Sequence, residues 1–567
     1  AMGMCSTRVN NISSKSVTGE STRYYTDLSR CLPSSAISRK TCRRQWRAVE
    51  YEAEDFSGVM LMSSPECRVP DIRMPLLCSG WYAIFLGLYS LDPRENEGIR
   101  VRLSSDKVFS LVKPEPTEVD VFDRIDEVFW KSADLSGQSL VISHPQFSIS
   151  SYIAYIKVVL MSDMPLEGQH CERVLMEKKR EDTNTKRLIA MNDGFGILGV
   201  KRAKSRAELC EDIEPYRDTD VGKLYWCVGS GGDVYTSTSK IAGTFGDNVK
   251  AFPRPVDRKI RESLVTLRRR RVNMLKTVID YGRSVDLKVY LSLRLEAFAC
   301  SPPRDTVFTG DLYNRHPEWR CRDRDGVEIC RMSYAYPGMQ DFVISLLVEL
   351  SEFKPDGLSL LFPRGAPYLL YEPILIDGYR KRHGVDPRTL DEYNKSWLNY
   401  KAEIMTGFMR KVRKAIHPDI ALSVHTLNDE QTNLFYGLDV ESWIGEGLVN
   451  EVVAYPWNDQ TVDVDYYVQI VKNSSCKLFV ELFPRNMEPG DYQSKAIALY
   501  NKGVDGLCLW DTNARHPQLR QWSMIRRLGH KEKLMSWDNG EGTFYKTVQL
   551  RSIGSCRVDR YTPAWSF

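Results

Sequence analysis

The chain has 567 residues, more than one compact domain usually holds, so the sequence predicts at least two domains. Hydrophobic residues make up 42% of it, charged residues 27% and aromatic residues 11%, which excludes a mostly disordered chain, a collagen and a coiled coil. The 78 Lys and Arg residues nearly balance the 74 Asp and Glu residues, and a formal net charge of +4 on so large a surface does not indicate nucleic-acid binding.

The sequence contains no pattern typical of a membrane span, a metal site or a cofactor. Its most apolar stretch, residues 80–91, is too short to cross a bilayer and contains Tyr and Ser. The 14 cysteines are scattered without a CxxC pair, and the 8 histidines form no HExxH motif. The glycine-rich stretch 229–233 lacks the ending of a P-loop, and we interpret it as a flexible loop near a site. We therefore expect neither a metal nor a cofactor.

Residues 1–4 resemble a cloning remnant placed before a native start. If a signal peptide preceded that start, the protein would be secreted or periplasmic. The sequence leaves localisation open, and it equally leaves open whether the chain forms a homo-oligomer.

The first third of the chain is predicted to begin with an irregular segment and to continue as β-structure. Residues 1–45 lack periodicity, and we interpret them as a lead segment. Residues 46–165 contain short β-branched and aromatic runs, such as 80–89, 99–103 and 152–161, which are separated by Pro, Gly, Asp and Ser. That spacing predicts an antiparallel β-sandwich that serves as an accessory domain.

From about residue 187 to residue 533, apolar strands alternate with long helical patterns, as in βαβ units. Expected helices include 257–281, 339–353, 393–416, 463–472 and 492–501. Eight strands are expected, at 224–228, 287–295, 331–334, 357–362, 420–424, 449–454, 477–482 and 506–510. Eight is the number that a closed (β/α)8 TIM barrel requires. Residues 534–567 are predicted to form a short β-rich tail, in which a hairpin packs on an earlier domain.

The loops after the strands of such a barrel meet at one mouth, where the active sites of this fold lie. Polar and aromatic side chains are frequent there, although exposed loops are polar in any protein. The candidates at the mouth are Arg294, Glu296, Arg364, Tyr371, Glu372, His425, Tyr455, Trp457, Glu481, Trp510 and Asp511. Aromatic faces stack on sugar rings and carboxylates bind their hydroxyls, so this mixture favours a carbohydrate site.

Glycosidic cleavage needs two carboxyl groups, one as acid and one as nucleophile or base. Strand alternation places Glu481 on the face of Phe479, and Asp511 on the face of Leu507 and Leu509, so we expect both to project into the mouth from adjacent strands. The structural alternatives are an ion pair of Glu481 with an arginine, and a turn or helix cap at Asp511. Glu372 is the third catalytic candidate, with a loop-surface carboxylate as its alternative.

The remaining candidates are expected to bind substrate, and each has a structural alternative. Glu296 and Arg294 share a strand face and could equally close an internal ion pair. His425 is more often a hydrogen-bonded core histidine. Trp457 and Trp510 are expected as sugar platforms, with packing at the barrel rim as the alternative. Arg364, Tyr371 and Tyr455 are expected to contact sugar hydroxyls or rings.

Four motifs resemble the glycosyl-hydrolase-like family 10 barrels of bacteria: 225–233, 355–364, 393–400 and 506–511. The resemblance covers about residues 190–530 and includes the preceding β-sandwich. It implies a TIM barrel acting on a glycoside. In better understood relatives the strand after the Asp-Gly step ends in a catalytic acid, whereas this chain continues from Ser359 to Arg364 without one.

The sequence therefore predicts a glycoside hydrolase that cleaves an oligo- or polysaccharide with two carboxylates at the barrel mouth. The missing acid after the fourth strand leaves an alternative open, a non-catalytic glycan-binding protein on the same scaffold. A carboxyl separation of roughly 5 to 9.5 Å would favour the enzyme.

Overall fold

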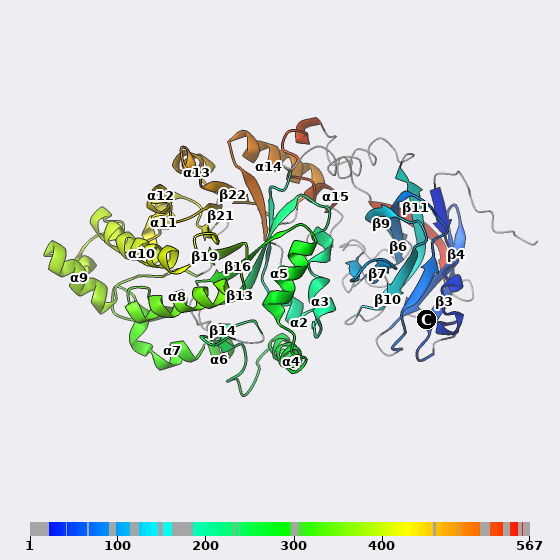
Figure 1. Ribbon diagram of the computed structural model, residues 1–567, viewed down its shortest axis with the longest axis horizontal. Helices are drawn as coiled ribbons and strands as arrows, with labels where there is room; N and C mark the ends of the chain where they lie inside the picture. The colour runs from blue at the N-terminus through cyan, green and yellow to red at the C-terminus, as the bar shows by residue number, and fades with distance from the viewer. Residues whose placement is uncertain are drawn as a thin grey trace, which may run out of the picture. The chain divides into compact units, whose positions relative to one another are not determined.

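The computed structural model describes residues 22–40, 42–64, 67–89, 98–113, 124–145, 151–161, 185–230, 233–236, 239–295, 305–308, 310–363, 365–456, 461–485, 487–510, 522–536, 545–553 and 558–559. The chain divides into two compact units (Figure 1). One consists of residues 1–176, 518–523 and 542–567, and the other of residues 177–517 and 524–541. The predicted domain limits at 45, 165, 187 and 533 stay predictions at the level of single residues.

The larger unit is built around a closed parallel barrel, which confirms the predicted TIM-barrel fold. Its eight strands are β12 (Leu188–Asn192), β13 (Val221–Ser230), β16 (Lys288–Arg294), β19 (Gly357–Leu361), β20 (Ala421–Thr426), β21 (Glu451–Ala454), β22 (Lys477–Glu481) and β23 (Gly506–Trp510). Each pairs in parallel with the next, and β12 pairs with both β13 and β23, so the ring is complete.

Two details of the barrel differ from the prediction. The expected strand at 331–334 lies outside the ring, because β18 (Glu328–Met332) forms an antiparallel hairpin with β17 (Arg320–Arg322) in the loop after β16. The first barrel strand is instead β12, which the sequence reading missed. All five residues of β12 are buried, so it shows none of the alternation by which a half-exposed strand is recognised.

The helices of this unit surround the barrel strands (Figure 1). The longer ones are α4 (Pro255–Arg269), α5 (Met274–Ser284), α8 (Pro337–Ser351), α9 (Pro373–His383), α10 (Lys395–Ala415), α13 (Val464–Val471) and α14 (Pro489–Asn501). The shorter ones are α2 (Gly196–Gly199), α3 (Arg206–Cys210), α6 (Asp305–Phe308), α7 (Asp311–Arg315), α11 (Glu430–Phe435) and α12 (Val440–Gly445). Helix α15 (Trp522–Ile525) contains the boundary between the two units in the sequence.

The single helix expected at 257–281 is divided into α4 and α5. Arg271 adopts a φ of 55°, a left-handed conformation that ends a helical run. Asn273 then caps α5, because its side chain accepts a hydrogen bond from the backbone N–H of Lys276. The break lets α5 run as a separate helix before β16.

The smaller unit contains two antiparallel sheets that share a hydrophobic core, as the predicted β-sandwich requires. The large sheet contains β1 (Thr22–Tyr25), β2 (Ile37–Ser38), β3 (Trp46–Ala53), β4 (Ser57–Ser63), β6 (Trp81–Tyr89), β9 (Arg124–Asp134), β11 (Ser151–Leu160), β24 (Tyr545–Ile553) and β25 (Val558–Asp559). The small sheet contains β5 (Ile72–Pro75), β7 (Ile99–Leu103), β8 (Ser110–Val112) and β10 (Ser139–Ser143).

Strand β24, from the end of the chain, completes the large sheet. It pairs antiparallel with β9 on one side and β3 on the other, so β3, β4, β11, β6, β9 and β24 form a closed ring. Leu550 and Ile553 of β24 join the buried cluster inside this ring together with Tyr51 and Tyr155. The predicted β-rich tail is thus an integral strand of the N-terminal sheet.

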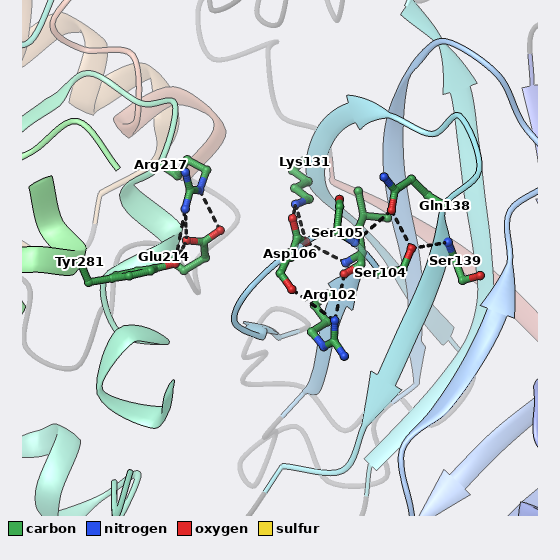
Figure 2. Close-up of polar contacts among 11 residues, drawn as sticks. Arg102, Ser104, Ser105, Asp106, Lys131, Gln138, Ser139, Glu214, Arg217 and Tyr281 are labelled. Atoms are coloured by element: carbon green, nitrogen blue, oxygen red, sulfur yellow. Dashed lines mark hydrogen bonds and ion pairs between the residues drawn. The ribbon is translucent and has the colours of Figure 1, made fainter. Parts of the chain in front are cut away.

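A polar cluster links the two sheets of the smaller unit (Figure 2). Asp106, in the turn after β7, forms an ion pair with Lys131 of β9 at 2.7 Å and accepts a hydrogen bond from the backbone N–H of Leu103, also at 2.7 Å. The Gln138 side chain, just before β10, accepts hydrogen bonds from Ser104 Oγ and the Ser105 N–H of this turn. These contacts fix the β7 turn against the large sheet.

A second polar cluster belongs to the barrel unit (Figure 2). Glu214 follows α3, forms a two-pronged ion pair with Arg217 at 2.9 and 3.0 Å, and accepts a hydrogen bond from the hydroxyl of Tyr281 on α5. The cluster holds the loop after α3 on α5. Among the described residues, no helix has the length and apolar character that crossing a membrane requires.

Candidate functional site

The amino-terminal end of the barrel is closed by a polar cluster centred on Glu451, the first residue of β21. Its carboxylate accepts hydrogen bonds from Tyr225 at 2.5 Å and Tyr290 at 2.9 Å, and forms an ion pair with Lys223. The two tyrosine rings stack with their centroids 4.7 Å apart. These side chains fill that end of the barrel.

Above this cluster, side chains from seven of the eight strands form one buried interior cluster. It consists of Ile189, Met191, Tyr225, Cys227, Tyr290, Leu361, Val453, Tyr455, Phe479, Cys508 and Trp510. On β22 the inward face therefore carries Phe479 and continues to Glu481. On β23 the inward face carries Cys508 and Trp510.

Glu481 is the last residue of β22, and its side chain has no exposed surface. Its Oε1 accepts a hydrogen bond from the backbone N–H of Trp510 at 3.1 Å and lies 3.4 Å from Nε of Arg485. Burial lowers the pKa of Arg485, but the Glu481 carboxylate and the Tyr455 hydroxyl more than offset this and raise it above its ordinary value. The end of β22 thus carries a buried, arginine-paired carboxylate.

Two aromatic residues and two arginines form one chain of contacts with Glu481. Arg485 donates a hydrogen bond to the Tyr455 hydroxyl at 2.8 Å, and its guanidinium carbon lies 5.3 Å from the centroid of the Trp510 ring. The Tyr455 and Trp510 rings meet edge to face at 5.3 Å, and the Arg294 guanidinium lies 5.7 Å from the Trp510 centroid. The structure therefore brings together five residues from the ends of β16, β21, β22 and β23. Because both rings are buried, their contact with a sugar stays a prediction.

His425 lies within the barrel below this group and has no exposed surface. Its Nε2 is 3.8 Å from Cys508 Sγ, and its Nδ1 is 3.4 Å from Ser359 Oγ. Burial lowers the pKa of His425 to about 3, so the ring is neutral at physiological pH. Burial and the neighbouring Glu481 carboxyl raise the pKa of the Cys508 thiol well above its usual range. His425 is a buried, hydrogen-bonded histidine, as the structural alternative described.

The contacts of Glu372 and Tyr371 described below are with residues outside the group around Glu481. The Glu372 carboxylate is fully buried and accepts hydrogen bonds from the backbone N–H groups of Leu370, at 3.1 and 3.2 Å, and Arg322, at 3.2 Å. Burial raises its pKa, although these N–H donors oppose the rise. The Tyr371 ring stacks on Trp397 of α10, with centroids 5.4 Å apart. Both residues hold the loop between β19 and α9, and the catalytic role of Glu372 and the binding role of Tyr371 stay predictions.

Four predicted site residues lie outside the described residues: Glu296, Arg364, Trp457 and Asp511. Asp511 was expected to project into the mouth because it shares a strand face with Leu507 and Leu509. The residues of β23 in the interior cluster are instead Cys508 and Trp510. The catalytic role of Asp511 stays a prediction.

Sequence reasoning missed Asp233, which lies on the short strand β14 (Asp233–Val234) just after β13. Burial, and then the carboxylates of Asp311 and Asp247, raise the pKa of Asp233 to about 6. The only sequence signal was its position at the end of a glycine-rich stretch after a strand. Among the described residues, no group of three or more His, Cys, Asp or Glu side chains is arranged to hold a metal ion.

No protein-family model matches the chain, and no curated protein sequence matches it. Among solved structures, the α-galactosidase TtGalA of Thermus thermophilus is 11% identical with a TM-score of 0.33, over 85% of this chain and 91% of that one. The CBM22-1–GH10 modules of Clostridium thermocellum xylanase 10B are 10% identical with a TM-score of 0.29, over 88% and 95% of the two chains.

A cycloisomaltooligosaccharide glucanotransferase of Paenibacillus sp. is 12% identical with a TM-score of 0.31, over 78% of this chain and 53% of that one. These scores are too low to carry an argument about activity. The narrower resemblance to glycosyl-hydrolase-like family 10 stays a prediction, and the function has to be argued from the site.

Proposed function

We propose that the protein is a glycoside hydrolase that cleaves a glycosidic bond in an oligo- or polysaccharide at the carboxyl-terminal end of its barrel. The observation that supports this most is Glu481. It is a carboxylate at the end of a barrel strand, held by Arg485 and the Trp510 N–H, and Arg485 in turn contacts Tyr455 and Trp510. The ends of barrel strands are where this fold carries its catalytic groups.

The environment of Glu481 suits one of the two carboxyl roles. A carboxylate paired with a guanidinium carries negative charge, which a nucleophile needs to attack the anomeric carbon and a base needs to activate water. It is a poor proton donor for the same reason. We therefore assign Glu481 as nucleophile or base, and Asp511 is the second carboxyl that the sequence predicted.

A second function is favoured by one observation, the complete burial of the Glu481 side chain. A carboxylate with no exposed surface that pairs with Arg485 also serves as a structural ion pair at the barrel rim. In that case the protein binds a glycan without cleaving it, and the barrel supplies only the scaffold.

The test is hydrolysis of a panel of aryl glycosides and polysaccharides by the wild type, Glu481→Gln and Asp511→Asn. If Glu481 is the nucleophile or base, E481Q loses at least about 1,000-fold in kcat/KM, whereas its KM changes little. NMR of the first-formed anomer then distinguishes retention from inversion.

Glu451→Gln is the matched control, because Glu451 is also a buried, cation-paired glutamate on a barrel strand but lies at the opposite end. Assayed below its melting temperature, E451Q keeps its activity. A wild type that releases sugar and an E481Q variant that does so equally well would exclude Glu481. Glycan binding by calorimetry without any hydrolysis would favour the second function.

A further inference from the structure

The second feature at the mouth is Asp233, which the proposed mechanism leaves without a role. Strand β14 folds back on the carboxyl-terminal end of β13, where Ser230 pairs with Asp233 and Gly229 with Val234. Asp233 therefore lies at the same end of the barrel as Glu481. In the order of the ring, β12 and β23 separate β13 from β22, so the two carboxyl groups come from well-separated positions around the mouth.

The backbone around Asp233 leaves room for its carboxyl and supplies no partner for it. Gly243 of β15 (Gly243–Thr244) lies opposite, and a Cβ at that position would come within 2.7 Å of Asp233 Oδ1. A side chain there would displace the carboxyl. The Asp233 side chain makes no hydrogen bond or ion pair with any residue that the structure describes.

The charges that face Asp233 are negative, and each has its own partner. Asp247 forms ion pairs with Arg261 at 2.6 Å and Arg268 at 3.5 Å, both on α4. Asp311, the first residue of α7, accepts a hydrogen bond from the side-chain amide of Asn248 at 2.8 Å. Asp233 is thus the one member of the three whose side chain has no cation or donor among the described residues.

Glu481 and Asp233 have opposite electrostatic surroundings. Glu481 touches an arginine, whereas Asp233 faces two other carboxylates. Two carboxyl groups in one mouth whose surroundings favour opposite charge states divide the roles of acid and nucleophile between them. A glycosidase needs this division, because the leaving oxygen must be protonated while the other group stays anionic.

We propose that Asp233 is the general acid of the site and acts together with Glu481, an assignment that rests on the proposed glycosidase function. As the bond between the anomeric carbon and the glycosidic oxygen breaks, its electron pair goes to the oxygen and the Asp233 proton is transferred to that oxygen. Glu481, or a water that Glu481 deprotonates, forms the new bond to the anomeric carbon. In the retaining case, the Asp233 carboxylate then takes a proton from the water that hydrolyses the glycosyl ester.

The experiment compares Asp233→Asn with the wild type on two aryl glycosides of one sugar that the wild type cleaves. One carries dinitrophenol, which departs without protonation, and the other carries unsubstituted phenol. D233N loses about 100- to 10,000-fold in kcat on the phenyl glycoside and retains most of its activity on the dinitrophenyl glycoside. E481Q loses activity on both.

The pH profile gives an independent measurement. The wild-type kcat/KM on the phenyl glycoside falls as the pH rises through about 6, because the acid must be protonated. This alkaline limb is absent in D233N. In Asp311→Asn the limb moves to lower pH, because one of the facing carboxylates has been removed.

The outcomes separate the two proposals. If E481Q is inactive while D233N cleaves the phenyl glycoside at the wild-type rate with an unchanged pH profile, the assignment of Asp233 fails and the glycosidase stands. If the wild type cleaves no glycoside, the proposed function fails. Equal loss on both leaving groups in D233N, with no loss of thermal stability, would make Asp233 a binding residue and overturn its role as the acid.

Discussion

His425 is a residue whose surroundings determine its charge. It has no exposed surface, and its neighbours Ser359 and Cys508 are neutral groups. In the unfolded chain its pKa is near the ordinary value of 6.5, whereas burial lowers it to about 3 in the folded protein. Between these values the unfolded state binds a proton that the folded state does not, so acid favours unfolding.

The free energy of unfolding should therefore fall as the pH drops from 6.5 towards 3, with a contribution from His425 of up to about 1.4 kcal/mol per pH unit. His425→Gln, which keeps a hydrogen-bonding side chain, should flatten this dependence in urea unfolding curves recorded between pH 4 and 8. The matched control is His417→Asn at an exposed histidine, which should leave the slope unchanged. An equal slope in wild type and H425Q would contradict a neutral His425.

The contribution of Asp233 to stability depends on pH in the opposite direction to that of His425. Its pKa rises from 3.8 to about 6 on folding, so its contribution to stability is fully present below pH 3.8 and is lost as the pH rises through 6. Asp233→Asn should therefore be more stable than the wild type at pH 7, by about 2 kcal/mol, and the difference should vanish near pH 4. Chemical denaturation at the two pH values measures this. A less stable D233N at pH 7 would mean that Asp233 holds a cation there.

At the scale of elements, buried parallel strands and helical periodicity could be predicted from the sequence, and short irregular features could not. Seven barrel strands follow from apolar runs between helices. Strand β12 was missed although it is as fully buried as β19 and β23, which were predicted. The β17–β18 hairpin was taken for a barrel strand because a short β-rich run does not reveal its partner. The left-handed residue between α4 and α5 leaves no clear periodic signal.

The residues of the candidate site could likewise be predicted only in part. Glu481, Tyr455 and Trp510 could be found because they end strands, and all barrel strands end at one mouth. The inward face of β23 was assigned wrongly, because both faces of a barrel strand are apolar and alternation alone does not say which is inside. Asp233 was missed because its raised pKa comes from burial and from the carboxylates of Asp311 on α7 and Asp247 after β15, which only the fold brings near it.

The Glu451 cluster is an element-scale prediction, since it links β13, β16 and β21 across the barrel. Glu451→Ala would leave the buried Lys223 ammonium and two tyrosine hydroxyls without their acceptor. We expect it to destabilise the barrel by about 3–5 kcal/mol in urea unfolding. Glu50→Ala is the control, because the Arg39–Glu50 pair is largely exposed and should contribute less than about 1 kcal/mol. Equal losses in the two variants would contradict the role of the cluster.

At the scale of the whole molecule, the two units have separate cores, and the smaller one depends on a strand from the far end of the chain. A chain that stops after residue 544 lacks β24, which exposes the edges of β3 and β9 and removes Leu550 and Ile553 from the ring. In scanning calorimetry we expect the truncated chain to lose the transition of the smaller unit and to keep that of the barrel. Dye binding should report the exposed apolar surface.

Loss of both transitions would mean that the barrel depends on the smaller unit for its stability. Leu550→Ala is a milder form of the same change. Because Leu550 is buried in the ring, this variant should lower the first transition without abolishing it.

The place of β24 in the ring also sets an order of events during synthesis. About 380 residues separate the end of β11 from the start of β24, so a ribosome adding about 5–20 residues per second needs about 20–80 s to deliver the missing strand. Throughout that interval the nascent N-terminal sheet has two unpaired edges, and it cannot close before the barrel has been translated. The first unit to emerge is therefore the last to be finished, and its open edges are where a chaperone would be needed.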